Sequence, residues 1–208
     1  SSQSQTVTFT VVSTDNRGVN SVTVNNGASY SSTSGTSYYF TKTFNYADFG
    51  WGSTTQTFTA TSRDAAGNST TSTCNVSITK SDTQSPSISS FSVNDNTITL
   101  TSSSTSQTVT YTVSTTDNRG ITSVSIPGAS HTNTSGSTYT FTETFNYSSY
   151  SYGTHSVTRT VTVADAAGNS STNNLSLSVS KTDNQNPLIS NYSANNTSLN
   201  VTSSSQSV

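Results

Sequence analysis

The sequence predicts an all-β protein made of sandwich domains in tandem, with no helices, and three observations support this. The chain repeats itself: Asp64-Ala-Ala-Gly-Asn68 returns 101 residues later as Asp165-Ala-Ala-Gly-Asn169. Apolar residues alternate with Thr and Ser over short runs, which is the pattern of half-buried strands. No helical period is found. A repeat of about 100 residues is too long for a solenoid unit and suits a self-contained domain.

Two further segments fix the frame of the repeat. Gln5–Gly18, which ends in Asp-Asn-Arg-Gly, returns as Gln107–Gly120. Lys80-Ser-Asp-Thr-Gln-Ser-Pro86 returns as Lys181-Thr-Asp-Asn-Gln-Asn-Pro187. We therefore expect a string of like domains, an arrangement that usually provides reach, spacing or avidity rather than chemistry.

The repeat frame does not coincide with the ends of the sequence. Residues 1–82 are expected to form a repeat that lacks its own first strand, residues 83–182 a complete repeat, and residues 183–208 the first strand of a third. One interpretation is a window cut from a longer array. The other is head-to-tail assembly, in which segment 187–208 completes the first domain of the next molecule by β-strand addition.

The complete repeat begins with two expected strands. Ile98 and Leu100 mark an opening strand within 87–101. The next, 107–115, contains Thr108-Val-Thr-Tyr-Thr-Val113, which alternates with period two. In both segments β-branched Thr faces water while the apolar residues face a core.

Four more strands follow. Val124 and Ile126 mark strand 121–126, and the remaining three alternate in the same way, at 138–146, 156–164 and 171–180. About seven short strands with turn signals between them, in roughly 100 residues, favour an immunoglobulin-like Greek-key sandwich.

Composition excludes several functions. Charged residues are 8% of the chain, against about a quarter in typical proteins. Seven Lys and Arg and a net charge of −2 argue against nucleic acid as a partner. No apolar run approaches the roughly 20 residues of a membrane span, so no membrane insertion is expected. The single cysteine, Cys74, matches Leu175 and is interpreted as a small core residue. Without disulfides, a secreted domain of this size needs another source of rigidity, such as metal ions.

The few acidic residues are placed informatively. Six of the nine form three repeat-matched pairs: Asp15/Asp117, Asp64/Asp165 and Asp82/Asp183. In a sandwich of this topology the loops that carry Asp117 and Asp165 share one end with the start of the first strand, which Asp82 precedes. We therefore predict that Asp82, Asp117 and Asp165 converge on one calcium site, since calcium takes six to eight oxygen ligands.

The remaining aspartates are assigned by the same frame. Asp183 would begin the next site, and Asp15 with Asp64 would form the top of the first domain. Asp48 lies at the opposite end of that domain and could approach the first site. The alternative is pure turn chemistry, because Asp-Asn-Arg-Gly and Asp-Ala-Ala-Gly-Asn are good turn sequences. Arg17 and Arg119 could then neutralise the carboxylates in place of a metal.

Two aromatic segments, Phe44–Gly52 and Phe145–Gly153, could stack on sugar rings. The alternative is a corner that packs against the end of the sandwich. No catalytic motif is present: there is no Gly-x-Ser-x-Gly, His-Glu-x-x-His or Gly-rich phosphate loop. Glu143 matches Lys42, which argues against a paired-carboxylate hydrolase site in each repeat. We expect a protein that is not an enzyme.

The chain resembles the tandem bacterial immunoglobulin-like, cadherin-like repeats of very long extracellular adhesins. The resemblance rests on Tyr152-Gly-Thr-His155, on Asp165–Asn169 with the strand after it, and on Asp183-Asn-Gln-Asn-Pro187. It implies an extracellular protein, at the cell surface or secreted, with calcium at domain junctions and neighbouring repeats as partners.

The expected function is therefore a rod-like stalk or spacer that holds an adhesive tip away from a surface. Two alternatives stay open. One is a self-assembling extracellular filament or surface layer, in which other copies join by β-strand donation. The other is a carbohydrate-binding module that recognises cell-surface glycans through the aromatic segments.

Overall fold

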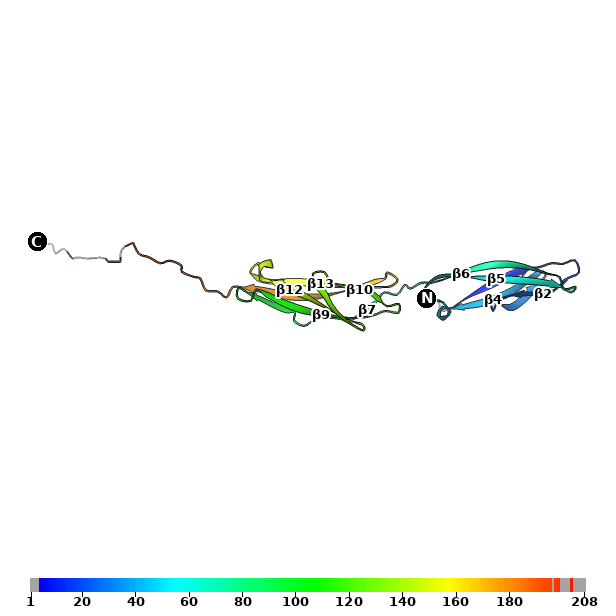
Figure 1. Ribbon diagram of the computed structural model, residues 1–208, viewed down its shortest axis with the longest axis horizontal. Helices are drawn as coiled ribbons and strands as arrows, with labels where there is room; N and C mark the ends of the chain where they lie inside the picture. Colours follow the sequence, from blue (N-terminus) through cyan, green and yellow to red (C-terminus); the bar gives the residue numbers. More distant parts are fainter. Residues whose placement is uncertain (1–3, 196, 199–202, 204–208) are drawn as a thin grey trace. The chain divides into compact units, whose positions relative to one another are not determined.

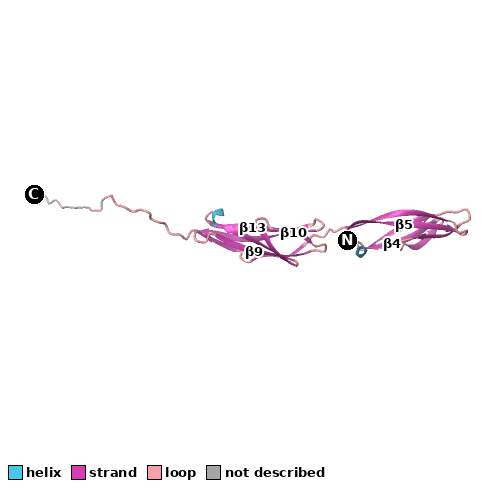
Figure 2. Ribbon diagram, in the orientation of Figure 1, coloured by secondary structure: helices cyan, strands magenta, loops and turns pink. Residues whose placement is uncertain are grey.

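The computed structural model describes residues 4–195, 197–198 and 203, and the chain divides into two compact units, Ser1–Gln84 and Ser85–Val208. Both units are built from strands, with only single 3₁₀ turns at Tyr46–Asp48 and Tyr147–Ser149 (Figure 2). The predicted all-β fold class is confirmed for the described part of the chain. The domain limits 1–82, 83–182 and 183–208 stay a prediction.

The first unit contains two three-stranded sheets (Figure 1). One has the order β1-β4-β3 and the other β2-β5-β6. The strands are β1 (Ser4–Val12), β2 (Val19–Val24), β3 (Ser29–Ser34), β4 (Ser37–Asn45), β5 (Gly52–Asp64) and β6 (Ser69–Lys80). Both β1 and β6 lie at the edges of their sheets.

The second unit repeats this arrangement and adds one strand to each sheet. Its sheets have the orders β11-β12-β9-β7 and β10-β13-β14-β8. The strands are β7 (Ser87–Val93), β8 (Thr97–Thr101), β9 (Ser106–Thr116), β10 (Ile121–Ser125), β11 (Ser130–Ser135), β12 (Thr138–Asn146), β13 (Gly153–Asp165) and β14 (Ser170–Thr182). Neighbouring strands pair antiparallel, except that β8 pairs parallel with β14.

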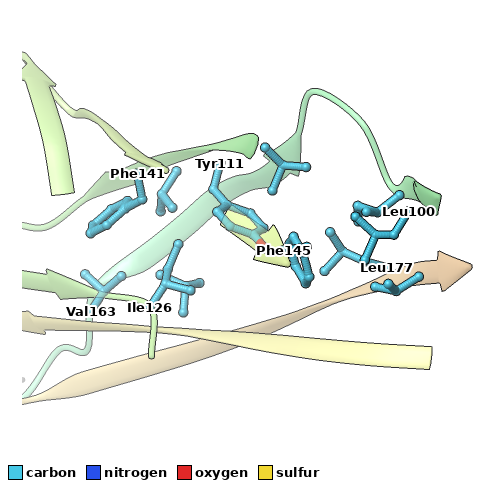
Figure 3. Close-up of a cluster of buried hydrophobic side chains, with 12 residues drawn as sticks. Leu100, Tyr111, Ile126, Phe141, Phe145, Val163 and Leu177 are labelled. Carbon is cyan, nitrogen blue, oxygen red and sulfur yellow. The ribbon is translucent and has the colours of Figure 1, made fainter. Parts of the chain in front are cut away.

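Alternating side chains from the two sheets of the second unit meet in a core (Figure 3). Tyr111 of β9 lies close to Phe145 of β12, with Leu177 of β14 on the facing sheet. Each of these three side chains is buried. The first unit has a smaller buried cluster, formed by Phe9, Phe40, Phe44 and Phe58. Aromatic residues therefore dominate a core that has fewer strands to cover it.

The structure corrects the prediction of a single strand over 87–101. That segment forms two strands, β7 and β8, which belong to opposite sheets. Asp95 holds the corner between them: its Oδ1 accepts the Thr97 N–H at 2.9 Å and its Oδ2 accepts Gln107 Nε2 at 2.9 Å. Period-two alternation predicts extended chain but cannot reveal that a strand changes sheets.

Two strands have no counterpart in the predicted set. They are β3 and β11, and every residue of both is exposed. Their sequences, Ser-Tyr-Ser-Ser-Thr-Ser and Ser-His-Thr-Asn-Thr-Ser, carry no apolar alternation. Such strands are recognised by their pairing with β4 and β12 and not by a buried face.

The expectation that Cys74 is a core residue is wrong, because its side chain is exposed. Cys74 lies on the edge strand β6 of the first unit. Its counterpart Leu175 on β14 packs against the core of the second unit, where β7 and β8 extend the two sheets. The repeat position is thus the same, but its burial depends on strands that the described residues of the first unit do not supply.

Candidate metal centre

The structure brings three of the predicted aspartates together. One carboxylate oxygen each from Asp82, Asp117 and Asp165 lie within 4.8 Å of one another. Asp82 stands in the connecting segment 81–86 that leads into β7, Asp117 directly follows β9, and Asp165 ends β13. This is the arrangement that the repeat frame predicts, because the loops after β9 and β13 lie at the end where β7 begins.

Asp165 is held by the tight turn between β13 and β14. Its Oδ1 accepts the backbone N–H groups of Ala167 and Asn169 at 2.7 and 2.8 Å, and its Oδ2 accepts Asn169 Nδ2 at 2.7 Å. Burial raises the pKa of Asp165, but the Asn169 side chain and the turn N–H groups outweigh it, so the pKa lies below its ordinary value. The carboxylate therefore stays charged at neutral pH.

One carboxylate oxygen of Asp117 accepts no hydrogen bond in the described structure. Its Oδ2 accepts the Arg119 N–H at 2.7 Å, whereas its Oδ1 is buried and has no hydrogen-bond partner in the described structure. A buried carboxylate oxygen without a partner is costly. A cation between the three carboxylates would satisfy it.

Two hydrogen bonds hold the connecting segment that carries Asp82, one at Asp82 and one at Pro86. Asp82 Oδ1 accepts the Gln84 N–H at 3.0 Å. Pro86 is buried, and its carbonyl accepts Ser171 Oγ of β14 at 2.6 Å. The first contact forms the turn at Asp82, and the second anchors the residue directly before β7 within the second unit.

This donor set fits a hard cation such as calcium. Three carboxylates supply oxygen ligands, and their mutual repulsion without a cation is unfavourable. Among the residues that the structure describes, this is the single group of three or more acidic, His or Cys side chains close enough to share an ion. Calcium bound there would supply positive charge and hold the segment with Asp82 to the loops with Asp117 and Asp165.

The aspartates of the first unit keep the turn chemistry without the cluster. Asp15 Oδ1 accepts the Arg17 N–H at 2.8 Å. Asp64 accepts the Asn68 N–H at 2.8 Å and Asn68 Nδ2 at 2.7 Å, and the Asn68 side chain holds the pKa of Asp64 below its ordinary value. Turn chemistry is therefore present at every repeat-matched loop, and it does not by itself explain the convergence in the second unit.

The other two predicted aspartates belong to no cluster of three in the described residues. Asp183 Oδ1 accepts the Gln185 N–H at 2.9 Å and Ser102 Oγ at 3.1 Å. Asp48 is exposed, and its Oδ2 accepts Asn45 Nδ2 at 3.1 Å. The assignment of all seven aspartates as metal ligands stays a prediction.

Sequence reasoning missed a lysine under each aromatic segment. Lys181 Nζ donates to the Tyr150 carbonyl at 2.7 Å and lies 4.0 Å from the ring centroid of Tyr147. Lys80 Nζ makes the same contacts in the first unit, at 2.9 Å from the Phe49 carbonyl and 3.9 Å from the Tyr46 ring. The repeat could have revealed these lysines, because each stands two residues before a repeat-matched aspartate, as in Lys80-Ser-Asp82 and Lys181-Thr-Asp183.

A partly buried ion pair in the second unit was also missed. Glu143 accepts Nε of Arg159 at 2.9 Å and the hydroxyl of Tyr111 at 2.8 Å through the same Oε2. A second guanidinium nitrogen contacts Oε1. No repeat signal could have found this set, since the first unit has Lys42 and Phe58 in place of Glu143 and Arg159.

Comparison with known proteins gives structural similarities and no sequence match. No family model matches the chain, and neither does any curated protein sequence. The EC1–4 region of PcdhgB3 is 12% identical with a TM-score of 0.33, over 77% of this chain and 40% of that one. The sialic acid binding region of the Streptococcus sanguinis SK1 adhesin is 12% identical with a TM-score of 0.31, over 86% and 74%.

A third similar structure is an enzyme. The endo-fucoidan hydrolase MfFcnA4 of glycoside hydrolase family 107 is 14% identical with a TM-score of 0.31, over 85% of this chain and 27% of that one. The chain therefore spans well under two thirds of two of these three proteins. Similarities at this level give no argument about activity. No helix in the described residues has the length and apolar character of a membrane span.

Proposed function

We propose that this chain is a non-enzymatic structural repeat of an extracellular stalk or spacer, stiffened by calcium where the connecting segment meets the second unit. The observation that carries the proposal is the convergence of Asp82, Asp117 and Asp165 within 4.8 Å. Two of these residues come from loops of the second unit and one from the segment before it. An ion that binds all three favours the one conformation of the segment in which they meet.

The placement of the charged groups supports a structural role. Glu143 is held by Arg159 and Tyr111, so its oxygens are occupied by donors inside the sandwich. Asp64 and Asp165 accept the N–H groups of their own turns. Each of these carboxylates holds the fold together, and none has the open, paired geometry of a hydrolytic acid and base.

An extracellular setting follows from the same proposal. Calcium sites in extracellular modules bind with dissociation constants of about 10⁻⁴ to 10⁻³ M, so they fill where calcium is abundant. The chain has a single cysteine, Cys74, and so no internal disulfide. Calcium would then supply the rigidity that disulfides supply in many secreted domains.

The aromatic segments favour packing over sugar binding. In the second unit Tyr147 and Tyr152 meet edge to face at 81°, and Lys181 lies over both rings. In the first unit Tyr46 and Trp51 meet at 84° under Lys80. In both pairs one ring face is taken by the ammonium group, and the rings meet edge to face, so they do not form one flat surface.

Calcium-dependent thermal unfolding tests the proposal. At a calcium concentration of about ten times the dissociation constant, selective binding to the folded state stabilises by about 1.4 kcal/mol. For a domain of about 100 residues this raises the melting temperature of the second unit by about 6–11 °C relative to EGTA.

The matched variants are Asp117→Asn and Asp15→Asn. Both residues accept the N–H of the arginine two positions later, but only Asp117 belongs to the cluster. We expect Asp117→Asn to abolish the calcium-dependent rise and Asp15→Asn to keep it. A rise that survives in Asp117→Asn, or no rise in the unaltered chain, would leave the aspartates as turn residues and remove the stiffening mechanism.

A further inference from the structure

The first unit contains a surface pocket with a volume of about 440 Å³. Strands of both sheets line it, together with the corner between β2 and β3 and the 3₁₀ turn before β5. Each of these elements has a counterpart in the second unit, so the two units can be compared at this place. The lining residues are Asn26, Lys42, Thr43, Phe44, Asp48, Phe49 and Gln56.

In the second unit an ion pair occupies the corresponding place. The guanidinium carbon of Arg159, which is bound to Glu143, lies 5.8 Å from the ring centroid of Phe145. The corner between β10 and β11 closes over the pair. A Cβ at Gly128 in this corner would lie 3.4 Å from Glu143 Oε1 and 3.7 Å from Arg159 Nε. The two charged side chains thus lie between the corner and the Phe145 ring.

The first unit has a phenylalanine in place of the arginine. Phe58 stands at the position of Arg159 and is 1% exposed. Its ring centroid lies 6.1 Å from that of Phe44, within the core. Because Phe58 packs into the core, the place that the guanidinium takes in the second unit stays open in the first, and Phe44 lines it.

A lysine replaces the glutamate of the ion pair. Lys42 stands at the position of Glu143 and is half-buried. A Cβ at Gly27 in the corner would lie only 3.0 Å from its Nζ. Among the described residues the ammonium group has no ion-pair or hydrogen-bond partner. A half-buried cation without a counter-charge is unfavourable, and an anion in the pocket would supply one.

The other polar groups of the pocket offer hydrogen-bond acceptors from three elements. Asn26 Nδ2 in the corner donates to the Thr57 carbonyl at 2.6 Å, which leaves its Oδ1 as an acceptor. Asp48 Oδ2 at the 3₁₀ turn accepts Asn45 Nδ2 at 3.1 Å, which leaves its Oδ1. Gln56 of β5 is half-buried, and its side-chain amide makes no hydrogen bond within the described part of the chain. A ligand here meets one cation and several acceptors.

We propose that this pocket binds a carboxylated sugar. The carboxylate would pair with Lys42 in a charge-assisted hydrogen bond. The sugar hydroxyls would donate to the acceptors of Asn26, Asp48 and Gln56. The volume of about 440 Å³ lies within the range of about 300–1,000 Å³ that is typical of small-ligand sites.

The distribution of acceptors favours a sugar over other small carboxylates. An amino acid also carries a carboxylate, but its remaining donor is one ammonium group at one point. The hydroxyls of a sugar ring point outward in several directions, as acceptors on three separate elements require. A neutral sugar would leave the Lys42 ammonium without a counter-charge.

The pocket is distinct from the other sites described above. Tyr46 and Trp51, which pack with Lys80, do not line it. Phe44 and Phe49 do, with ring centroids 6.0 Å apart, and they offer apolar surface to the C–H groups of a sugar ring. No residue of the candidate metal centre belongs to it, so binding is expected without calcium.

Titration of the full chain with glucuronate in EGTA, followed by ¹H–¹⁵N NMR spectra, tests the proposal. We expect the side-chain amide signals of Asn26 and Gln56 to shift with a dissociation constant of roughly 1 mM, the scale for a ligand of this size. Glucose, the neutral match, should bind about tenfold more weakly because it lacks the charge-assisted bond. Glutamate should also bind more weakly than glucuronate.

The matched variants are Lys42→Met and Arg63→Met, which each remove one positive charge from the first unit. Arg63 is exposed and does not line the pocket. Lys42→Met should reduce glucuronate binding about tenfold, to the level of glucose, and Arg63→Met should leave it unchanged. Trp51 fluorescence in urea reports whether the first unit of each variant is folded. Gln56→Leu, which keeps the charge, should weaken binding severalfold and tests the pocket independently of Lys42.

Four results would overturn the proposal. The signals of Asn26 and Gln56 could stay in place at glucuronate concentrations far above the millimolar range. Glucose could bind as well as glucuronate, which would remove the role of the ammonium group. Glutamate could bind more tightly, which would make the ligand an amino acid. Finally, Arg63→Met could weaken binding as much as Lys42→Met, which would reduce the effect to net charge.

Discussion

Removal of the Glu143 carboxylate should destabilise the second unit and leave the first unchanged. Glu143 is 9% exposed, and the Tyr111 it binds is 0% exposed. In Glu143→Ala the Tyr111 hydroxyl loses its acceptor inside the core, and Arg159 loses its counter-charge. The Glu143 contact raises the pKa of Arg159, against the effect of its burial. The variant loses this contact, but the guanidinium still stays charged, because the pKa of an arginine lies far above neutral pH.

The magnitude follows from the burial of each partner. A buried hydroxyl without a partner costs about 1–3 kcal/mol. Breaking a fully buried ion pair costs about 3–5 kcal/mol, but the Arg159 side chain is 23% exposed and water can reach it, so we add only about 1 kcal/mol for this loss. The free energy of unfolding of the second unit should therefore fall by about 2–4 kcal/mol.

Urea unfolding with two probes measures the effect separately in each unit. The single tryptophan, Trp51, lies in the first unit, so its fluorescence follows that unit alone, while far-ultraviolet circular dichroism follows both. Glu143→Ala should split the two transitions, with fluorescence unchanged. Glu143→Gln is the matched control: it keeps an acceptor for Tyr111 and should cost less.

A second control is an apolar replacement of the whole set. The first unit has Phe9 and Phe58 at the positions of Tyr111 and Arg159, and their ring centroids are 4.6 Å apart. Replacing Tyr111, Glu143 and Arg159 together by Phe, Leu and Leu should cost less than Glu143→Ala alone, since no polar group is then left unpaired. If the triple variant is the less stable of the two, the reasoning from unpaired partners is refuted.

Three other effects should be measurable. The hydrogen bond to Tyr152 raises the pKa of Tyr147 to about 12; in Tyr152→Phe this pKa should return toward 10.0, as followed by spectroscopic titration of the phenolate. The pKa of Asp165 is lower in the folded state than in the unfolded state. As pH falls, the Asp165 carboxylate is therefore protonated in the unfolded state before it is protonated in the folded state. The stabilisation is present above the ordinary value of 3.8 and is lost as pH falls through the lowered one; Asp165→Asn should therefore show a shallower loss of melting temperature between about pH 5 and pH 2. Lys181→Met removes the bond to the Tyr150 carbonyl and should lower the stability of the second unit by about 1–2 kcal/mol in urea unfolding, with unchanged fluorescence of the first unit; no loss would mean that the lysine is only a solvated neighbour of the rings.

Most strands were predictable because their physical cause is local. In the middle of β9, and in β12 except at Glu143, apolar residues alternate with Thr, and the buried positions Tyr111 and Phe141 follow that alternation. The strands that escaped prediction, β3 and β11, bury nothing. They are held by backbone pairing to their neighbours, which leaves no trace in the pattern of side chains.

The convergence of the candidate metal centre was predictable for a different reason. The repeat frame fixes which loops share one end of a sandwich, and so Asp82, Asp117 and Asp165 could be grouped before any coordinates. The set of Tyr111, Glu143 and Arg159 could not be grouped in that way. These residues lie on three strands at unrelated separations, and only the packing of the two sheets brings them within hydrogen-bond distance.

By itself, then, the sequence determined the fold class, the repeat and the end of the domain at which the aspartates gather, because each depends on periodicity or on position within a motif. The tertiary structure alone decided that segment 87–101 divides between two sheets and that Cys74 is exposed. Burial is a property of which strands lie together, and a residue such as Cys74 is a core position only when a neighbouring strand covers it.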